Sequence, residues 1–182
     1  GTKTPEDFAT GHTQMKSLLN QYGHPDVLLL DSERGFALGE GGGPTAQQPT
    51  YQAWNLVRQY MIDQLYEVPL TVWYEWTGED AFELFDNSLQ PTPAANAAQV
   101  MLTEMDGFHL DSRISLGDSR NYLLRFVDEQ GTSKFVGWRS PPSGGSPDQA
   151  GTSVVSLDVS GYVGNPSALA TLTSIFGSEQ MI

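Results

Sequence analysis

Residues 26–36 read DVLLLDSERGF, and this stretch decides the fold expected for the chain. Its first part, Asp26–Leu30, is a short apolar run without alternation, which is typical of a strand buried on both faces of a parallel sheet. A helix predicted over Thr13–Tyr22 precedes it, and the glycine-rich residues 39–44 follow it. Together with the helices and the strand expected further along the chain, this order of elements is typical of βα units.

The flanking segments continue the alternation of helix and strand. Residues up to about His12 are polar, and we expect them to form a loop. Thr50 is a suitable N-cap for a long helix, and Gly107 is a suitable end for another. The further elements expected are a helix over 51–66, a strand at Pro69–Trp76 and a helix from Pro93 to Met105.

The pattern changes after Gly107, where short alternating segments are separated by turns rich in Gly, Pro, Asp and Ser. These segments are Phe108–Leu116, Asn121–Asp128, Lys134–Arg139, Thr152–Ser160 and Ala168–Phe176. Such a series predicts antiparallel β structure, half of a β-sandwich, with a long hairpin loop over 140–151. We therefore expect an α/β domain at 1–107 and a β-sandwich domain at 108–182.

The charge balance and composition exclude several classes of protein. Among 182 residues, 9 are Lys or Arg and 22 are Asp or Glu, which gives a formal net charge of -13. Binding to a nucleic-acid backbone or an anionic membrane needs clustered cations, so neither partner is expected. The absence of cysteine excludes disulfides and thiolate zinc sites, and the three histidines lack the spacing of a zinc motif. No metal or cofactor is expected.

Glu33 is the first candidate for a chemical role. It stands where the predicted strand ends, and α/β barrels place their catalytic groups at that end of their strands. A carboxylate there can act as a nucleophile or a general base, and the glycine-rich loop beside it would let a substrate approach closely. Position alone leaves an ordinary alternative open, in which Glu33 is an exposed loop acid paired with Arg34.

Aromatic residues surround Glu75 at the end of the second predicted strand, within the sequence PLTVWYEW at 69–76. Flat aromatic faces suit stacking against sugar rings. The alternative follows from strand geometry: Trp73 and Glu75 face one way while Tyr74 and Trp76 face the other, so one pair packs in the core.

Two βα units cannot close a parallel sheet, because a (β/α)8 barrel needs eight of them and about 250 residues. Both predicted strands would have open edges. We therefore expect this chain to be the back half of something larger.

Three stretches, taken in order, resemble a clan A glycoside hydrolase of the family 39 type, the group of the β-xylosidases and α-iduronidases. Residues 27–36 look like the family's seventh strand, which ends in the "(S/T)-E-W-G" motif of the nucleophilic glutamate. Residues 52–76 look like the next helix and the eighth strand, and residues 89–97 resemble the entry to the last barrel helix. The likeness covers roughly residues 13–140. It implies the C-terminal part of a (β/α)8 barrel followed by a β-sandwich.

Carried over position by position, the resemblance implies that Glu33 is the nucleophile and that Trp73 is the aromatic floor beside the sugar. The implied substrate contacts are Arg34, Trp73, Tyr74, Glu75 and Trp76. The chain departs from the family at two places: Arg34 replaces the family's Trp, and residues 92–95 replace its Lys-Pro-Ala-Tyr.

The family's acid/base glutamate lies in an Asn-Glu pair, and no Asn-Glu occurs in this chain. Retention needs two carboxyl groups about 5–5.5 Å apart. We therefore expect an N-terminal segment or a companion chain to supply the second one, across a large apolar interface of an obligate heterodimer. The start at Gly1, without a leader, leads us to expect a processed or trimmed product.

The expected function is that of a subunit of a retaining glycoside hydrolase, which cleaves glycosidic bonds in a polysaccharide or oligosaccharide once its missing half is present. The acidic, cysteine-free composition favours secretion. The alternative is a non-catalytic carbohydrate-binding or interaction protein on a relic barrel.

Overall fold

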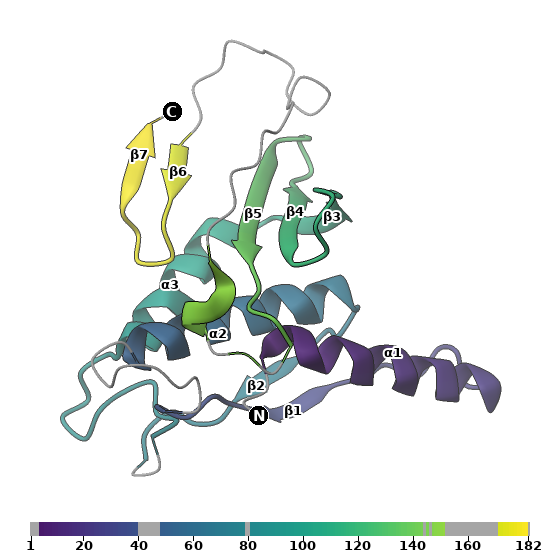
Figure 1. The fold of residues 1–182 in the computed structure, drawn as a ribbon, viewed down its shortest axis with the longest axis horizontal. Helices are drawn as coiled ribbons and strands as arrows, with labels where there is room; N and C mark the ends of the chain where they lie inside the picture. The colour runs from purple at the N-terminus through teal and green to yellow at the C-terminus, as the bar shows by residue number, and fades with distance from the viewer. Residues whose placement is uncertain are drawn as a thin grey trace.

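A computed structural model describes residues 4–39, 48–78, 81–143, 145, 147–151 and 171–181. In this part of the chain, a layer of helices lies between a pair of parallel strands and an antiparallel sheet (Figure 1). In chain order the elements are α1 (Pro5–Gln21), β1 (Asp31–Arg34), α2 (Gln48–Leu65), β2 (Thr71–Trp73), α3 (Pro93–Met105), β3 (His109–Arg113), β4 (Asn121–Val127), β5 (Ser133–Arg139), a 3-10 turn (Pro147–Ala150), β6 (Thr171–Thr173) and β7 (Glu179–Met181).

Helix α1 begins earlier than the sequence pattern predicts. Pro5 occupies its first position, and the Asp7 carboxylate accepts a hydrogen bond from the backbone N–H of Thr4 at 2.8 Å. Proline at the first position and an acid three residues after a threonine are both start signals for a helix. The expectation of a loop up to about His12 is therefore wrong, because it overlooked these signals.

Helix α2 forms the centre of the core. It starts at Gln48, so Thr50 lies inside the helix and is not its N-cap. Leu56 and Ile62 are almost completely buried, at 1% and 0% exposure. The core cluster joins α2 to α3 and to strand β4 of the antiparallel sheet. Its buried members are Ala53, Leu56, Val57 and Met61 of α2, Ala94 and Ala97 of α3, and Leu124 and Phe126 of β4. The helical part and the β part thus share one core.

Helix α3 confirms the prediction from Pro93 to Met105. The Thr92 side chain accepts a hydrogen bond from the backbone N–H of Ala95 at 3.3 Å and caps the first turn. Gly107 follows the helix with a φ of 76°, which lies in the left-handed region that glycine adopts readily.

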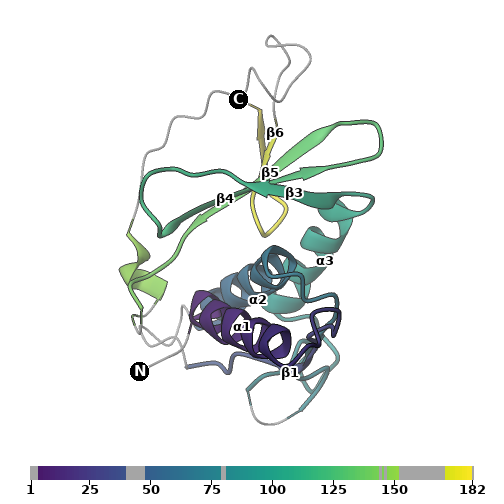
Figure 2. The ribbon, with the colours of Figure 1, turned by 90° about the vertical axis from the view of Figure 1, so that its right-hand side faces the viewer.

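The predicted strand at Asp26–Leu30 is not observed. Strand β1 lies further along the chain and pairs in parallel with β2, with Asp31 opposite Thr71 and Arg34 opposite Trp73. Val27, Leu28 and Leu30 are 49%, 68% and 55% exposed, so the expectation of burial on both faces is wrong. The physical reason is that helices cover one face of the strand pair, and no described helix or strand covers the other (Figure 2).

The antiparallel sheet confirms three of the predicted β segments. Its strands follow the order β3–β4–β5, and Leu124 and Phe126 of β4 are buried toward the helices. Strands β6 and β7 form a separate hairpin, and β6 lies within the predicted segment Ala168–Phe176. The segment Thr152–Ser160 lies outside the described residues. The described chain is therefore a mixed α/β structure with small sheets.

Among the described residues, none of the helices combines the length and the hydropathy that crossing a membrane requires.

Candidate active site

Glu33 lies near the carboxyl end of β1, where a parallel strand leaves the sheet. Its side chain is exposed, and within the described residues it forms no hydrogen bond or ion pair. Asp31 and Arg34, on either side of it, both turn toward the helices, because the pairing of β1 with β2 is irregular between these two residues. Glu33 is thus an exposed carboxylate without a side-chain partner among the described residues.

Arg34 is held away from Glu33 by other partners. Its guanidinium donates hydrogen bonds to both oxygens of Asp31, at 2.9 Å from Nη2 to Oδ1 and 3.0 Å from Nε to Oδ2. The same group lies over the ring of Phe8 in α1, 3.9 Å from its centroid. The pairing of Glu33 with Arg34, which the sequence left open, is therefore not what the structure shows.

The aromatic residues after β2 divide between core and surface. The indole N–H of Trp73 donates to the backbone carbonyl of Phe82 at 3.0 Å, and its ring lies 6.1 Å from that of the buried Phe36. Tyr74 and Trp76 are 37% and 65% exposed. The alternation expected for a strand is thus observed: Trp73 turns inward, and Tyr74 and Trp76 are available at the surface.

The chain beyond β1 and the chain beyond β2 are held together by backbone contacts. The backbone N–H of Tyr74 donates to the carbonyl of Arg34 at 2.7 Å. Gly35 is needed at this crossing, because a Cβ there would lie 2.5 Å from the carbonyl oxygen of Tyr74 and 2.7 Å from the Phe82 ring. This close approach places Glu33 and Tyr74 on neighbouring segments at the same end of the strand pair.

A glutamine of α2 secures the same region, and sequence patterns did not reveal it. The buried amide of Gln52 donates to the carbonyl of Phe36 at 2.9 Å and to that of Ala81 at 3.1 Å. It joins the segment after β1 to the segment after β2. At 3.6 residues per turn Gln52 lies off the apolar stripe of the predicted helix, so no sequence pattern marked it.

Glu75 is half-buried, and its carboxylate lies directly over Gly78. A Cβ at Gly78 would stand 1.6 Å from Oε1 of Glu75, so glycine is the residue that leaves room for this carboxylate. Glu75 is therefore held in place by the turn that follows β2.

Two hollows of the surface lie along α1 and the turn after it. One is lined by residues that include Thr13, Lys16 and Tyr66, and the other by residues that include Pro25 and Leu28. Neither includes Glu33 or the aromatic residues 73–76. Glu33 is exposed and lines neither of these two hollows.

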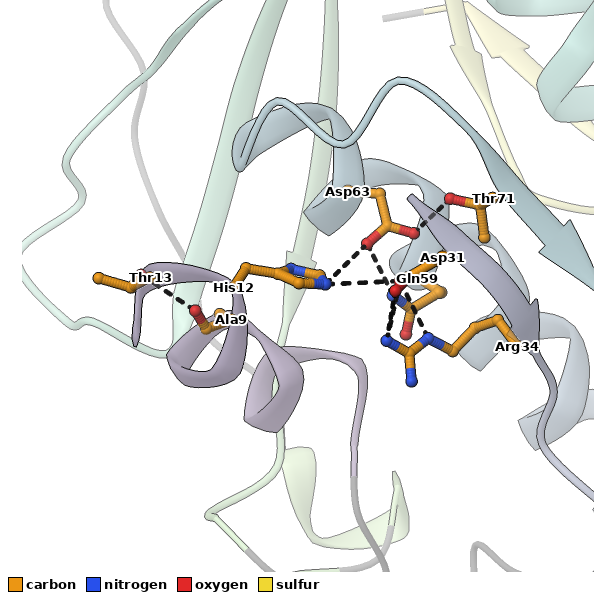
Figure 3. Close-up of polar contacts among 8 residues, drawn as sticks. All are labelled: Ala9, His12, Thr13, Asp31, Arg34, Gln59, Asp63 and Thr71. Carbon is orange, nitrogen blue, oxygen red and sulfur yellow. Dashed lines mark hydrogen bonds and ion pairs between the residues drawn. The ribbon is translucent and has the colours of Figure 1, made fainter. Parts of the chain in front are cut away.

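The structure also brings together three residues that the sequence treated separately. His12 of α1, Asp31 of β1 and Asp63 of α2 meet between the helices and the strand pair (Figure 3). Nε2 of His12 lies 3.5 Å from Oδ2 of Asp31 and 4.0 Å from Oδ1 of Asp63. Burial raises the pKa of the Asp63 carboxyl above its ordinary value, and the negative charge of Asp31 adds to this effect.

No protein-family profile and no curated protein matches this sequence. A solved structure does resemble it: a family 39 glycoside hydrolase from the gut symbiont Bacteroides cellulosilyticus WH2. The TM-score is 0.56 at 18% sequence identity, over 71% of this chain and 27% of that one. The chain is thus similar in fold to a part of that enzyme, and the match covers about a quarter of the enzyme's length.

Proposed function

We propose that this chain is part of a retaining glycoside hydrolase in which Glu33 is the nucleophile. The observation that carries the proposal is the position of Glu33: an exposed, unpaired carboxylate at the carboxyl end of a parallel strand, in a fold similar to that of a family 39 enzyme. Groups at this end of the strands are the ones that α/β barrels use for catalysis.

In the proposed reaction, the Glu33 carboxylate attacks the anomeric carbon and the bond to the leaving oxygen breaks. A second carboxyl group, about 5–5.5 Å from the first, protonates that oxygen. The same group then removes a proton from water, which releases the sugar from Glu33 and restores both side chains. The anomeric configuration is retained because inversion occurs twice.

We place the second carboxyl group on another polypeptide segment, either N-terminal to these residues in a longer chain or on a companion chain. This is supported by exposed apolar side chains on β2 and on the segment that precedes β1, Val72 and Leu28. Apolar side chains on adjacent segments are what an obligate interface buries. The partner segment would also form the opposite wall of the saccharide cleft.

Tyr74, Glu75 and Trp76 are proposed to line the sugar site, with Trp73 as its floor. Trp76 supports this part, because its exposed indole packs beside Phe85, with ring centroids 4.3 Å apart. A rigid, exposed aromatic face suits the C–H face of a pyranose. Arg34 would contact the substrate only after it leaves Asp31.

The test is hydrolysis of aryl glycosides by the chain together with any polypeptide that co-purifies with it. Glu33→Ala is expected to abolish turnover while the far-ultraviolet circular dichroism stays unchanged. Azide, a small anionic nucleophile, is expected to occupy the vacated space and yield a glycosyl azide of inverted configuration. Glu129→Gln, an exposed acid in the turn between β4 and β5, serves as the control and is expected to retain full activity. Activity of Glu33→Ala within a few fold of wild type would refute the assignment.

The exposure of Trp76 also favours a second candidate, a carbohydrate-binding protein without turnover. Calorimetry against an oligosaccharide panel separates the two. Binding that Trp76→Ala removes and Trp54→Ala leaves intact, in a protein that hydrolyses none of the panel, would establish this second function. Native mass spectrometry of the purified particle reports whether a companion polypeptide is present.

A further inference from the structure

Among the described residues, the buried imidazole of His12 lacks a hydrogen-bond partner. The residue is 7% exposed, and neither ring nitrogen forms a hydrogen bond with any of the described residues. Nε2 points at the carboxylates of Asp31 and Asp63, but at 3.5 Å and 4.0 Å (Figure 3). A charge-assisted hydrogen bond between such groups spans about 2.7–2.9 Å. A buried imidazole without a hydrogen bond indicates that a ligand can occupy the space between His12 and the two carboxylates.

The spacing of these atoms suits a metal ion. Zinc binds imidazole nitrogen at about 2.0–2.1 Å and carboxylate oxygen at about 2.0–2.2 Å, so two ligand atoms of a tetrahedral site lie about 3.3–3.5 Å apart. The distance from His12 to Asp31 lies at the upper end of this range, and the 4.0 Å from His12 to Asp63 exceeds it, so Asp63 would move closer on binding the ion. One ligand atom from each of His12, Asp31 and Asp63 can be chosen so that all three lie within 4.8 Å of one another.

Both carboxylates are oriented by hydrogen bonds from neighbouring side chains. The Thr71 hydroxyl donates to Oδ2 of Asp63 at 2.6 Å, and the Gln59 amide donates to Oδ1 at 2.9 Å. Arg34 orients Asp31 in the same way. Each carboxylate oxygen can accept more than one contact, and such outer partners are what hold ligands in place at metal sites.

We propose that His12, Asp31 and Asp63 bind one Zn²⁺ ion, with a water molecule as the fourth ligand. The ion would compensate the two neighbouring carboxylates, which Arg34 alone does not neutralise. Its three protein ligands come from α1, β1 and α2, so the ion would join the two helices to the strand. The role is structural, because the cluster lies on the helix side of β1, whereas Glu33 is exposed. The proposal does not depend on the glycosidase assignment.

The test uses the 182-residue chain, with any co-purifying polypeptide, after dialysis against a chelator. Titration calorimetry with ZnCl2 is expected to give one equivalent of bound zinc, with much weaker binding of MgCl2, because magnesium disfavours imidazole. Zinc is expected to raise Tm by several degrees. His12→Gln is expected to weaken zinc binding at least tenfold, whereas the exposed controls His24→Gln and His109→Gln stay within twofold of wild type.

X-ray absorption at the zinc edge keeps the proposal testable on the wild-type chain if His12→Gln does not fold. It is expected to show one imidazole and oxygen ligands around the bound ion. Absence of a one-equivalent site, two or more imidazoles at the zinc, or loss of binding in either control variant would overturn the proposal. A Tm that rises on acidification and does not change when zinc is added would also overturn the proposal, because a proton rather than a metal ion would then be bound between these side chains.

Discussion

The carboxylate of Glu6, in the first turn of α1, accepts a hydrogen bond from the indole N–H of Trp138 in β5 at 2.7 Å, across 132 positions of sequence. The same carboxylate pairs with the Arg58 guanidinium of α2, whose Nε donates to it at 2.8 Å. The side chains of Arg58 and Glu6 are 8% and 9% exposed. One buried acid thus connects both long helices to the antiparallel sheet.

Glu6→Ala is expected to lower the free energy of unfolding by about 3–5 kcal/mol, because Arg58 would remain buried without its counter-charge. Urea denaturation followed by circular dichroism measures this change. The control is Glu67→Ala, which removes the partner of Lys16 in an exposed ion pair and is expected to change stability little. Equal losses for the two variants would show that the Glu6 contacts contribute no more than a surface pair.

Gly35→Ala is expected to destabilise the protein by about 1–3 kcal/mol, the usual range for forcing extra atoms into a packed site. The added methyl would meet the carbonyl oxygen of Tyr74 and the ring of Phe82. The segment that follows β1 and the segment that follows β2 would therefore have to move apart.

Gly11→Ala is the matched control for that variant. Gly11 lies within α1, and a Cβ there would meet nothing within 4 Å. Alanine favours helix over glycine, so this change is expected to raise stability by about 0.5–1 kcal/mol. Urea denaturation compares both variants with wild type. A neutral Gly35→Ala would mean that the close crossing is not maintained in solution.

Asp118→Asn is expected to make stability less dependent on pH. The backbone N–H of Arg120 and the Arg139 guanidinium lower the pKa of Asp118 below its ordinary value. Because its pKa is lower in the folded chain, its contribution to stability is present above about pH 3.9, the unfolded value, and is lost as pH falls through the folded value. The variant should therefore be less stable than wild type at pH 7, and the difference should shrink as pH falls below about 3.9.

Urea denaturation at pH 7, 5, 3 and 2 measures that difference. A difference that stays constant over this range would show that the charge of Asp118 is not what stabilises the turn between β3 and β4.

Leu28→Glu is expected to prevent association with the partner segment proposed for the open side of the strand pair. A buried, unpaired carboxylate at an apolar interface opposes assembly. Leu102→Glu is the matched control, because Leu28 and Leu102 are both 68% exposed but Leu102 lies on α3. Native mass spectrometry measures the fraction of assembled particle. If Leu102→Glu also prevents assembly, or if Leu28→Glu still assembles, the interface lies elsewhere.

Local signals predicted some elements of this fold well. The Thr92-Pro93 start and the Gly107 stop delimit α3, because capping and backbone freedom depend on residues close in sequence. The alternation of β4 and β5 likewise predicted strands at the observed places. The start of α1 was also encoded locally, in Thr4, Pro5 and Asp7, but it was overlooked.

The surroundings of the candidate site could not be predicted from residues that are close in sequence. The sequence predicted Glu33 just beyond a strand over Asp26–Leu30, whereas in the structure Glu33 lies within β1 itself. Which partner Arg34 takes depends on the packing of α1 against β1. Trp73 and Trp76 belong to one short motif, yet one lies against the core and the other is exposed.

Sequence patterns alone located α3 and the strands of the antiparallel sheet. Only the tertiary structure decided that Val27, Leu28 and Leu30 stay exposed and that His12, Asp31 and Asp63 meet. The reason is physical: capping, turns and alternation are settled by neighbours in sequence. Burial and the partners of a charged side chain depend on layers contributed by residues far along the chain.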